Sequence, residues 1–126
     1  MNNQRFFNGK VIWITGASSG IGEELARQFS SFNTKLILSS RRKEELERVK
    51  ASLNINPDYV YILPLDLSDP ETLPEKAMEA EAAFGRIDIL VNNGGVTQRA
   101  MVMETPLEVD RRIMEINYFS GVILTK

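Results

Sequence analysis

Three glycines in the segment TGASSGIG, residues 15–22, have a spacing that suits the binding of a phosphate group. Gly16 permits a tight turn, Gly20 lets a ligand approach the backbone, and Gly22 permits close packing of a helix. A helix that begins near Gly20 directs its unpaired N–H groups and its positive dipole end at the ligand. The segment therefore predicts a loop for the pyrophosphate of a dinucleotide. The residues that we assign to this loop are Thr15, Gly16, Ser18, Ser19, Gly20, Ile21 and Gly22.

The spacing of this loop excludes one other class of phosphate site. The loop reads GxxxGxG, close to the common dinucleotide pattern GxGxxG, and it does not continue into the Gly-Lys-Ser/Thr of a P-loop. The alternative is a loop that only turns a strand into a helix. Against it, three glycines, a threonine and two serines fall together at the end of one apolar run.

Two adjacent arginines, Arg41 and Arg42, follow the second apolar run of the chain. A site for NAD has an acid at this place for the ribose 2′-hydroxyl, whereas arginine accommodates a 2′-phosphate. The nearest acids, Glu44 and Glu45, lie one turn into the next helix. Because guanidinium groups bind phosphate through two parallel hydrogen bonds, the arginines favour NADP(H) over NAD(H). The alternative is a pair of solvated side chains at a helix start, where the helix dipole disfavours cations.

Two further polar segments follow apolar runs. The residues that we assign to the cofactor in them are Asp66 and Leu67 in the first, and Asn93, Gly94 and Gly95 in the second. Asp66 could instead cap the following turn, and Asn92–Gly95 could be no more than a turn. Asn117 lies among apolar neighbours in a predicted helix, where a polar amide needs a hydrogen-bond partner. Asn117 could therefore belong to the site, or it could be an ordinary helix residue whose side-chain amide is hydrogen-bonded.

Alternating strands and helices must position these residues. Short apolar runs predict buried strands over residues 11–14, 36–38, 59–65 and 87–91. Helical spacing predicts helices that begin near residues 20, 43, 72 and 105, the last of them reaching nearly to Lys126. This alternation predicts an α/β fold, a doubly wound parallel sheet with strand order 3-2-1-4. All four polar segments then lie at the carboxyl ends of strands, where such sheets bind ligands.

Side-chain patterns add detail to the first three helices. Helical spacing places on their buried faces Ile21, Leu25 and Phe29, then Leu46, Val49 and Leu53, and then Leu73, Ala77 and Phe84. Glu44 and Arg48 are spaced to pair on the exposed face of the second helix. Thr72 and Glu75 form a capping box for the third helix, and Gly85 is placed to end it.

Composition limits the kinds of function. The 126 residues suffice for one domain, which we place over 1–126. A net charge of −2 predicts no nucleic-acid partner and does not support membrane association. With no histidine and no cysteine, we predict neither a metal site nor a Ser-His hydrolase. Because the sequence has no signal segment and no run of about 18 apolar residues, we expect a cytoplasmic protein.

With these motifs collected, the sequence resembles the short-chain dehydrogenase/reductase family, and within it the dehydrogenase/reductase member 7 subgroup. The resemblance rests on TGASSGIG at 15–22, on Arg41, on DLSD at 66–69, on NNGG at 92–95 and on the pair Asn117 and Tyr118. It implies a Rossmann-type fold and NADP(H)-dependent hydride transfer to or from a small carbonyl or alcohol substrate, steroids and retinoids among them. It also implies that Asp66 meets the adenine and that Asn117 belongs to the catalytic set.

The resemblance implies two further features. Members of the subgroup are often held on the endoplasmic reticulum membrane by an N-terminal anchor, so a longer N-terminus would place the protein there. The family's catalytic tyrosine and lysine form a YxxxK motif, with a serine upstream, and the resemblance places them after the last predicted helix. None of the three tyrosines forms it, because an apolar residue stands four positions later: Leu63 after Tyr59, Leu65 after Tyr61 and Val122 after Tyr118.

We therefore expect these 126 residues to be the N-terminal, cofactor-binding part of such an enzyme, truncated before its catalytic acid and without turnover of their own. Two functions stay open: an oxidoreductase represented by this part, and a nucleotide-binding or assembly module. A methyltransferase with a similar sheet is disfavoured by the basic end of the second strand.

We further expect self-association. The sheet would end at the fourth strand, which leaves residues 87–91 as an unpaired apolar edge. The last helix would lose part of the packing around Ile113, Ile116 and Leu124. A homo-oligomer through that helix is the expected result.

Overall fold

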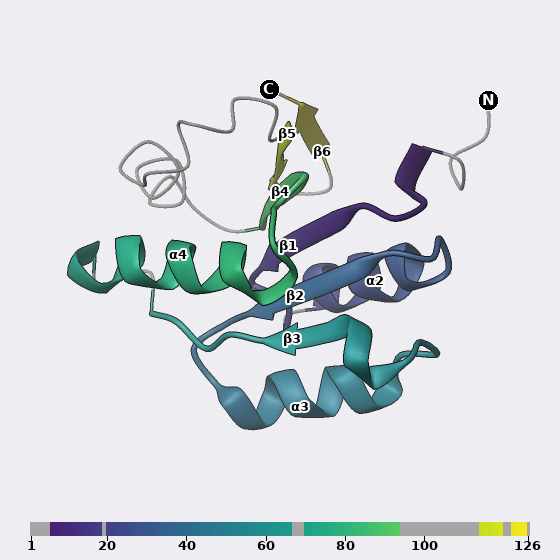
Figure 1. Ribbon diagram of the computed structural model, residues 1–126, viewed down its shortest axis with the longest axis horizontal. Coiled ribbons are helices and arrows are strands. Elements are labelled where there is room, and N and C mark those ends of the chain that lie inside the picture. The colour runs from purple at the N-terminus through teal and green to yellow at the C-terminus, as the bar shows by residue number, and fades with distance from the viewer. Residues whose placement is uncertain (1–5, 19, 67–69, 94–113, 120–121, 126) are drawn as a thin grey trace.

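The computed structural model describes residues 6–18, 20–66, 70–93, 114–119 and 122–125. Within these residues six strands form one sheet in the order β3-β2-β1-β4-β5-β6 (Figure 1). The strands are β1 (Val11–Thr15), β2 (Lys35–Ser39), β3 (Val60–Ile62), β4 (Ile89–Asn93), β5 (Met114–Phe119) and β6 (Val122–Thr125). The helices are α2 (Gly20–Ser30), α3 (Lys43–Ser52) and α4 (Leu73–Phe84), with short 3-10 helices η1 (Pro57–Tyr59) and η2 (Pro70–Thr72).

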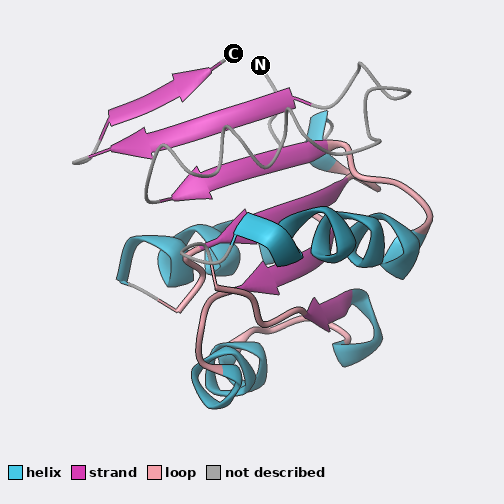
Figure 2. Ribbon diagram, turned by 90° about the vertical axis from the view of Figure 1, so that its left-hand side faces the viewer, coloured by secondary structure: helices cyan, strands magenta, loops and turns pink. Residues whose placement is uncertain are grey.

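The first four strands form a parallel core that has the predicted order. β1 pairs with β2 on one side and with β4 on the other, and β2 pairs with β3, all in parallel. Every residue of β1 is buried, as expected of a parallel strand that is covered on both faces. The strand order 3-2-1-4 is therefore confirmed, and Figure 2 shows these strands side by side with β5 and β6 in one continuous sheet.

Helices pack on both faces of the sheet. On one face, α2 and α3 bury Ala26, Phe29, Leu46 and Val49 against Ile12, Ile14, Leu36 and Leu38. On the other face, α4 buries Leu73, Ala77 and Ala80 together with Val11, Trp13, Ile37 and Leu90. The sheet is doubly wound, as predicted. The predicted buried positions of the second and third helices are also confirmed, since Leu46, Val49, Leu53, Leu73 and Ala77 are buried and Phe84 packs half-buried against the core.

The buried face of α2 differs from the predicted one. Gly22, Ala26 and Phe29 are buried and Leu25 is half-buried, but Ile21 is 40% exposed. The prediction is therefore wrong for Ile21. The first turn of α2 packs through Gly22 against the preceding loop, and successive helix residues point about 100° apart, so Ile21 is turned outward.

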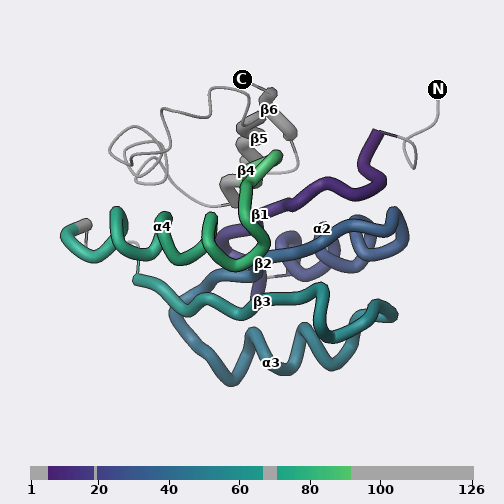
Figure 3. The backbone as a smooth tube through the Cα atoms, viewed as in Figure 1, coloured from purple at the N-terminus to yellow at the C-terminus, as the bar shows by residue number. Residues whose placement is uncertain are grey.

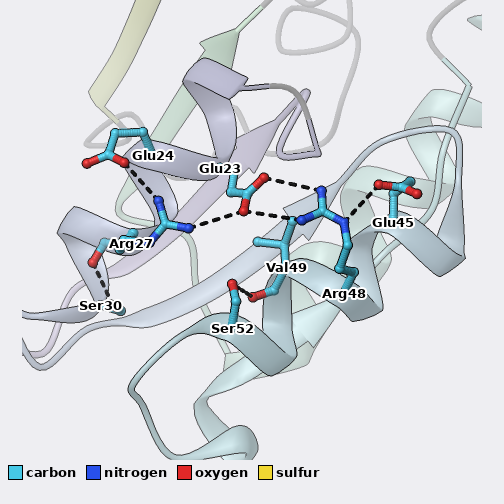
Figure 4. Close-up of polar contacts among 8 residues, drawn as sticks. All are labelled: Glu23, Glu24, Arg27, Ser30, Glu45, Arg48, Val49 and Ser52. Atoms are coloured by element: carbon cyan, nitrogen blue, oxygen red, sulfur yellow. Dashed lines mark hydrogen bonds and ion pairs between the residues drawn. The ribbon is translucent and has the colours of Figure 1, made fainter.

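The ion pairs of α3 also differ from the predicted pattern. Arg48 does not pair with Glu44 but with Glu45, at 3.0 Å, and with Glu23 of α2, at 3.2 Å (Figure 4). Glu23 also accepts a hydrogen bond from Arg27, at 3.1 Å. The packing of α2 beside α3 brings a carboxylate from another helix within reach of Arg48, which spacing within one helix does not reveal.

The two ends of α4 agree only in part with the prediction. Gly85 has a φ of +87° and ends the helix in a left-handed conformation, as predicted. Thr72 makes no side-chain cap hydrogen bond, so the predicted capping box with Glu75 is wrong. A capping side chain needs extended backbone at its own residue, whereas Thr72 ends η2 with helical dihedrals.

The C-terminal part of the described chain is strand where a helix was predicted. β5 pairs in parallel with β4, and β6 pairs antiparallel with β5. The prediction of a helix from residue 105 to nearly Lys126 is therefore wrong over 114–119 and 122–125, and residues 105–113 lie outside the described residues. The open edge of β4 offers backbone hydrogen bonds, and a segment rich in β-branched and aromatic residues pairs with it.

This extension changes two other expectations. β4 is not the edge of the sheet, because β5 covers it. The helix surface that was expected to hold a homo-oligomer is not formed by 114–119 and 122–125, and Ile113 lies outside the described residues.

At the amino end of the sheet, Asp88 joins β1 to the start of β4. Its carboxylate accepts hydrogen bonds from the backbone N–H of Val11 and from Nε of Arg86, both at 2.8 Å. Burial raises the pKa of Asp88, but the hydrogen bonds from Arg86 and Val11 and the charge of Lys10 outweigh it and hold the pKa below its usual value. Figure 3 traces the backbone from α4 into β4, and Asp88 immediately precedes β4 in the sequence.

Candidate functional site

The candidate site lies at the carboxyl ends of β1 to β4, where the order of the sheet switches between β1 and β4. Thr15, the last residue of β1, is fully buried, and its hydroxyl donates a hydrogen bond to the carbonyl of Val91 in β4, at 3.3 Å. This contact holds the two strands together at the point where they end. It places the start of the glycine-rich loop, Gly16–Ser18, over the switch.

The glycine-rich loop is fixed to the neighbouring strand as well. Gly16 has a φ of +65°, a conformation that glycine adopts without strain. The following N–H, that of Ala17, donates to the carbonyl of Ser39 at 3.0 Å, and Ala17 is fully buried. Ser18 is half-buried, and Ser19 lies outside the described residues. The loop is therefore anchored to β1 and β2 before α2 begins.

The three glycines of the loop have three different environments. Gly16 supplies the turn, and Gly22 packs so tightly that a Cβ there would overlap the carbonyl of Gly16. Gly20 opens α2, and among the described residues no atom outside its chain neighbours and its own helix backbone lies within 4 Å of its Cβ position. Open space at the amino end of a helix is where a bound phosphate would receive N–H groups. Ile21, the next residue in the sequence, is also exposed.

The end of β2 carries the two arginines. Arg41 and Arg42 are exposed and lie immediately before α3. The other three arginines of the described residues, which are Arg27, Arg48 and Arg86, all pair with carboxylates. Arg41 and Arg42 have no ion pair with any residue that the structure describes. Two unpaired cations beside a helix amino end form a site to which an anion would be attracted.

The backbone beyond β3 continues along β2 and brings Asp66 to the same end of the sheet. The N–H of Leu63 donates to Leu38, and that of Leu65 donates to Ser40, both at 2.9 Å. Asp66 follows directly and is half-buried. Asp66 is therefore the residue after Leu65, which is hydrogen-bonded to the residue before Arg41. Leu67 lies outside the described residues.

The end of β4 meets β5. Asn92 is in register with Asn117, and Asn93 with Tyr118. Asn117 was predicted within a helix and is instead in a strand, but the pairing brings its backbone beside β4 at the candidate site. Gly94 and Gly95 lie outside the described residues.

Sequence reasoning missed three residues that shape this site. Trp13, Ser39 and Ser40 were assigned only to strands or strand ends. Ser39 is fully buried and its Oγ accepts a hydrogen bond from Nε1 of Trp13 at 2.8 Å. The signal that points to such a contact is a serine at the end of an apolar strand, since a buried hydroxyl needs a partner.

The acidic side chain that follows the glycine-rich loop is paired with arginines. Glu23, in the first turn of α2, is the acid nearest in sequence to the glycine-rich loop. A hydrogen bond from Arg48 is the main cause that lowers the pKa of Glu23, with Arg27 adding to it and slight burial opposing it. The carboxylate is thereby engaged between α2 and α3 (Figure 4).

Two kinds of feature are absent from the described residues, a cluster of metal-binding side chains and a membrane-spanning helix. No group of three or more acidic, histidine or cysteine side chains is gathered there as metal ligands would be. No helix in the described ranges combines the length and apolar character that crossing a bilayer requires.

Sequence comparison links the chain to known proteins. The family model described as short chain dehydrogenase matches residues 10–126. Human dehydrogenase/reductase SDR family member 7 is 50% identical over 120 residues, which cover 92% of this chain and 35% of the human protein. The Anopheles gambiae protein named dehydrogenase/reductase SDR family protein 7-like is 48% identical over 129 residues, or 98% of this chain and 41% of the relative. The chain thus spans well under half the length of these relatives.

Solved structures have the same fold. The 3-ketoacyl-(acyl-carrier-protein) reductase of Brucella melitensis, complexed with NADH, matches with a TM-score of 0.63 and 36% identity, covering 71% of this chain and 36% of that one. The C-domain of a bacterial malonyl-CoA reductase, with NADP, matches with a TM-score of 0.66 and 34% identity, covering 75% and 16%. One neighbour therefore holds NADH and the other NADP.

Proposed function

The chain belongs to the short-chain dehydrogenase family, and on that premise we propose that the protein is an NADP(H)-dependent oxidoreductase. Its reaction would be the transfer of hydride between the nicotinamide cofactor and a small carbonyl or alcohol substrate, of the steroid or retinoid type. The cofactor would supply the hydride chemistry, and the residues of this chain would bind and orient it.

The open space at Gly20 carries the proposal. Gly16 turns the loop, Gly22 seats α2 against it, and Gly20 leaves room for a pyrophosphate at the helix amino end. The residues proposed to hold the pyrophosphate half are Thr15, Gly16, Ser18, Ser19, Gly20, Ile21 and Gly22.

The preference for NADP(H) over NAD(H) is supported by the charges at the end of β2. Arg41 and Arg42 are unpaired in the described residues, and the first acids of α3, Glu44 and Glu45, come after them. A 2′-phosphate would neutralise the arginines, whereas a 2′-hydroxyl would leave them without a partner.

The remaining assignments concern the rest of the cofactor and the substrate. Asp66 and Leu67 are proposed to meet the adenosine, and Asn93, Gly94 and Gly95 to line its path toward the nicotinamide. Asn117 is proposed as a member of the catalytic set. Its pairing with Asn92 supports this, because the backbone of Asn117 thereby lies at the candidate site.

Titration calorimetry with NADPH and NADH tests the proposal. These 126 residues should bind NADPH more tightly than NADH without oxidising it, because they contain no YxxxK motif. A longer form that carries this motif should oxidise NADPH in the presence of a carbonyl substrate from a panel of steroids, retinoids and small ketones. Binding by the longer form without turnover across the panel would identify a nucleotide-binding module instead. Binding of neither dinucleotide would refute the proposed site.

A further inference from the structure

Ser39 connects the glycine-rich loop to the body of the sheet through two separate hydrogen bonds. Its backbone carbonyl accepts from the N–H of Ala17 at 3.0 Å. Its side-chain Oγ accepts from Nε1 of Trp13 at 2.8 Å. Ser39 and Ala17 are 0% exposed and Trp13 is 1% exposed, so no water competes for these bonds. The end of β2 is therefore fixed to the loop by its main chain and to β1 by its side chain.

The next residue extends this frame to the arginines. The carbonyl of Ser40 accepts from the N–H of Leu65 at 2.9 Å, and its Oγ accepts from the N–H of Arg42 at 3.3 Å. Arg41 stands between these contacts, one residue beyond Ser40. Hydrogen bonds from β1, from the glycine-rich loop and from the segment after β3 thus converge on two serines that immediately precede the arginine pair.

This frame connects the two places at which the proposed cofactor carries negative charge. In NADP(H) the pyrophosphate and the 2′-phosphate are attached to one ribose, so their separation is limited by covalent structure. A protein that binds both must hold its two anion sites at a matching separation, and a preorganised separation avoids an ordering cost on binding. Ser39 lies on the short covalent and hydrogen-bonded path between them.

We infer that Trp13 and Ser39 are a positioning pair, which sets the separation of the glycine-rich loop from Arg41 and thereby gives NADP(H) its advantage over NAD(H). The inference rests on the proposed function and deepens it. Because Trp13 and Ser39 are both buried, neither would touch the cofactor. The pair acts on ligands that engage both anion sites at once and has no effect on ligands that engage only one.

Trp13→Phe in the full chain tests the inference, because phenylalanine keeps an aromatic ring in the core and removes only the indole N–H donor. Three probes separate the two sites. NADPH spans both, NADH lacks the 2′-phosphate, and 2′-AMP carries only the 2′-phosphate. We expect the dissociation constant of NADPH to rise about tenfold, the size of change that one hydrogen bond produces. Those of NADH and 2′-AMP should stay within about twofold.

A matched control uses the same part of the core. Ile37 is in register with Trp13 and belongs to the same hydrophobic cluster, so Ile37→Val removes a buried methylene without touching the hydrogen bond. All three probes should bind this variant as they bind the parent chain. Ser39→Ala removes the acceptor of the same bond and should repeat the effect of Trp13→Phe. The double variant should lose no more than either single one. If Trp13→Phe fails to fold by circular dichroism, Ser39→Ala alone answers the question.

Two results would overturn the inference: unchanged NADPH affinity in the folded variants, or equal weakening of NADH or 2′-AMP, which would show a general structural role. Failure of the proposed function looks different. In that case the parent chain itself would bind NADPH no more tightly than NADH, and Arg41→Ala would change neither affinity.

Discussion

Gly22 in the first turn of α2 lies against the carbonyl of Gly16, so closely that a Cβ atom on Gly22 would overlap that group and lie 2.9 Å from the Cα of Ala17. The helix and the loop before it are therefore one packed unit. Gly20 is two residues away, yet in the part of the chain that the structure describes its Cβ position meets no atom within 4 Å apart from its chain neighbours and its own helix backbone. The same segment thus contains one glycine that internal packing requires and one that faces open space.

Gly22→Ala should destabilise the fold. The added methyl group must displace backbone atoms of Gly16 and Ala17, which cannot move as a flexible side chain can. Overpacking of this kind costs about 1–3 kcal/mol. Urea denaturation followed by circular dichroism measures the loss, and a midpoint equal to that of the parent chain would contradict the packing argument.

Gly20→Ala should leave the fold stable but weaken the binding of the cofactor. The fold should be as stable as the parent or more stable by up to about 1 kcal/mol, since alanine is the better helix former and meets no neighbour. NADPH binding should weaken at least tenfold, because the methyl group would occupy the proposed phosphate position. Calorimetry on the two glycine variants provides the comparison, and undiminished NADPH affinity would mean that the loop is structural only.

Arg41→Ala should weaken NADPH by about 1.5–3 kcal/mol, the range for a hydrogen bond to a charged group, and leave NADH nearly unchanged. The matched control is Arg27→Ala, which removes an exposed arginine that pairs with Glu23 and Glu24 on α2. That variant should bind both dinucleotides as the parent chain does. Equal loss of NADPH and NADH in Arg41→Ala would exclude Arg41 as the 2′-phosphate ligand.

Asp88→Asn should destabilise the fold in a pH-dependent way. The pKa of Asp88 is lowered in the folded chain by Arg86 and Val11 despite partial burial, so its charge stabilises the fold above the unfolded-state pKa. The difference in unfolding free energy should be about 1 kcal/mol at neutral pH. It should vanish as the pH falls below about 4 and through the folded-state pKa. A difference that stays constant between neutral and acidic pH would show that the charge of Asp88 has no role.

Arg48→Ala should raise the pKa of Glu23 toward its ordinary value, because the hydrogen bond from Arg48 is the largest cause of its lowering. Carbon-detected NMR titration of the glutamate carboxyls measures this change. Glu24 is the internal control, since its lowered pKa comes from Gln28 and Arg27 rather than from Arg48. A Glu23 pKa that is the same in both proteins would mean that the α2–α3 pair is not formed in solution.

Much of this fold follows from short-range patterns. The apolar runs of β1, β2 and β4, the left-handed Gly85 at the end of α4 and the buried positions of α3 were all predictable, as was the order 3-2-1-4. Hydrophobic periodicity and glycine conformation depend on neighbours a few residues away, and right-handed crossovers then leave little choice of topology.

The sequence also located the residues of the candidate site. Thr15–Gly22 and Asp66 stand directly after apolar runs, Arg41 follows one after two serines, and the ends of parallel strands meet at one edge. Their assignment to a cofactor remains a prediction, and Ser19, Leu67, Gly94 and Gly95 lie outside the described residues.

Other features depend on contacts between segments that are distant in sequence. Residues 114–119 read as part of a helix, but the open edge of β4 pairs with them as β5. Arg48 meets Glu23 rather than Glu44 because α2 packs beside α3, and Ile21 is exposed because Gly22 must approach Gly16. The bond between Trp13 and Ser39 spans 26 residues. The helix or strand propensity of a single residue is worth only tenths of a kcal/mol. Strand pairing and the hydrogen bonds of buried polar groups form only when distant segments of the chain pack together. Where the two conflict, the tertiary contacts therefore decide the structure.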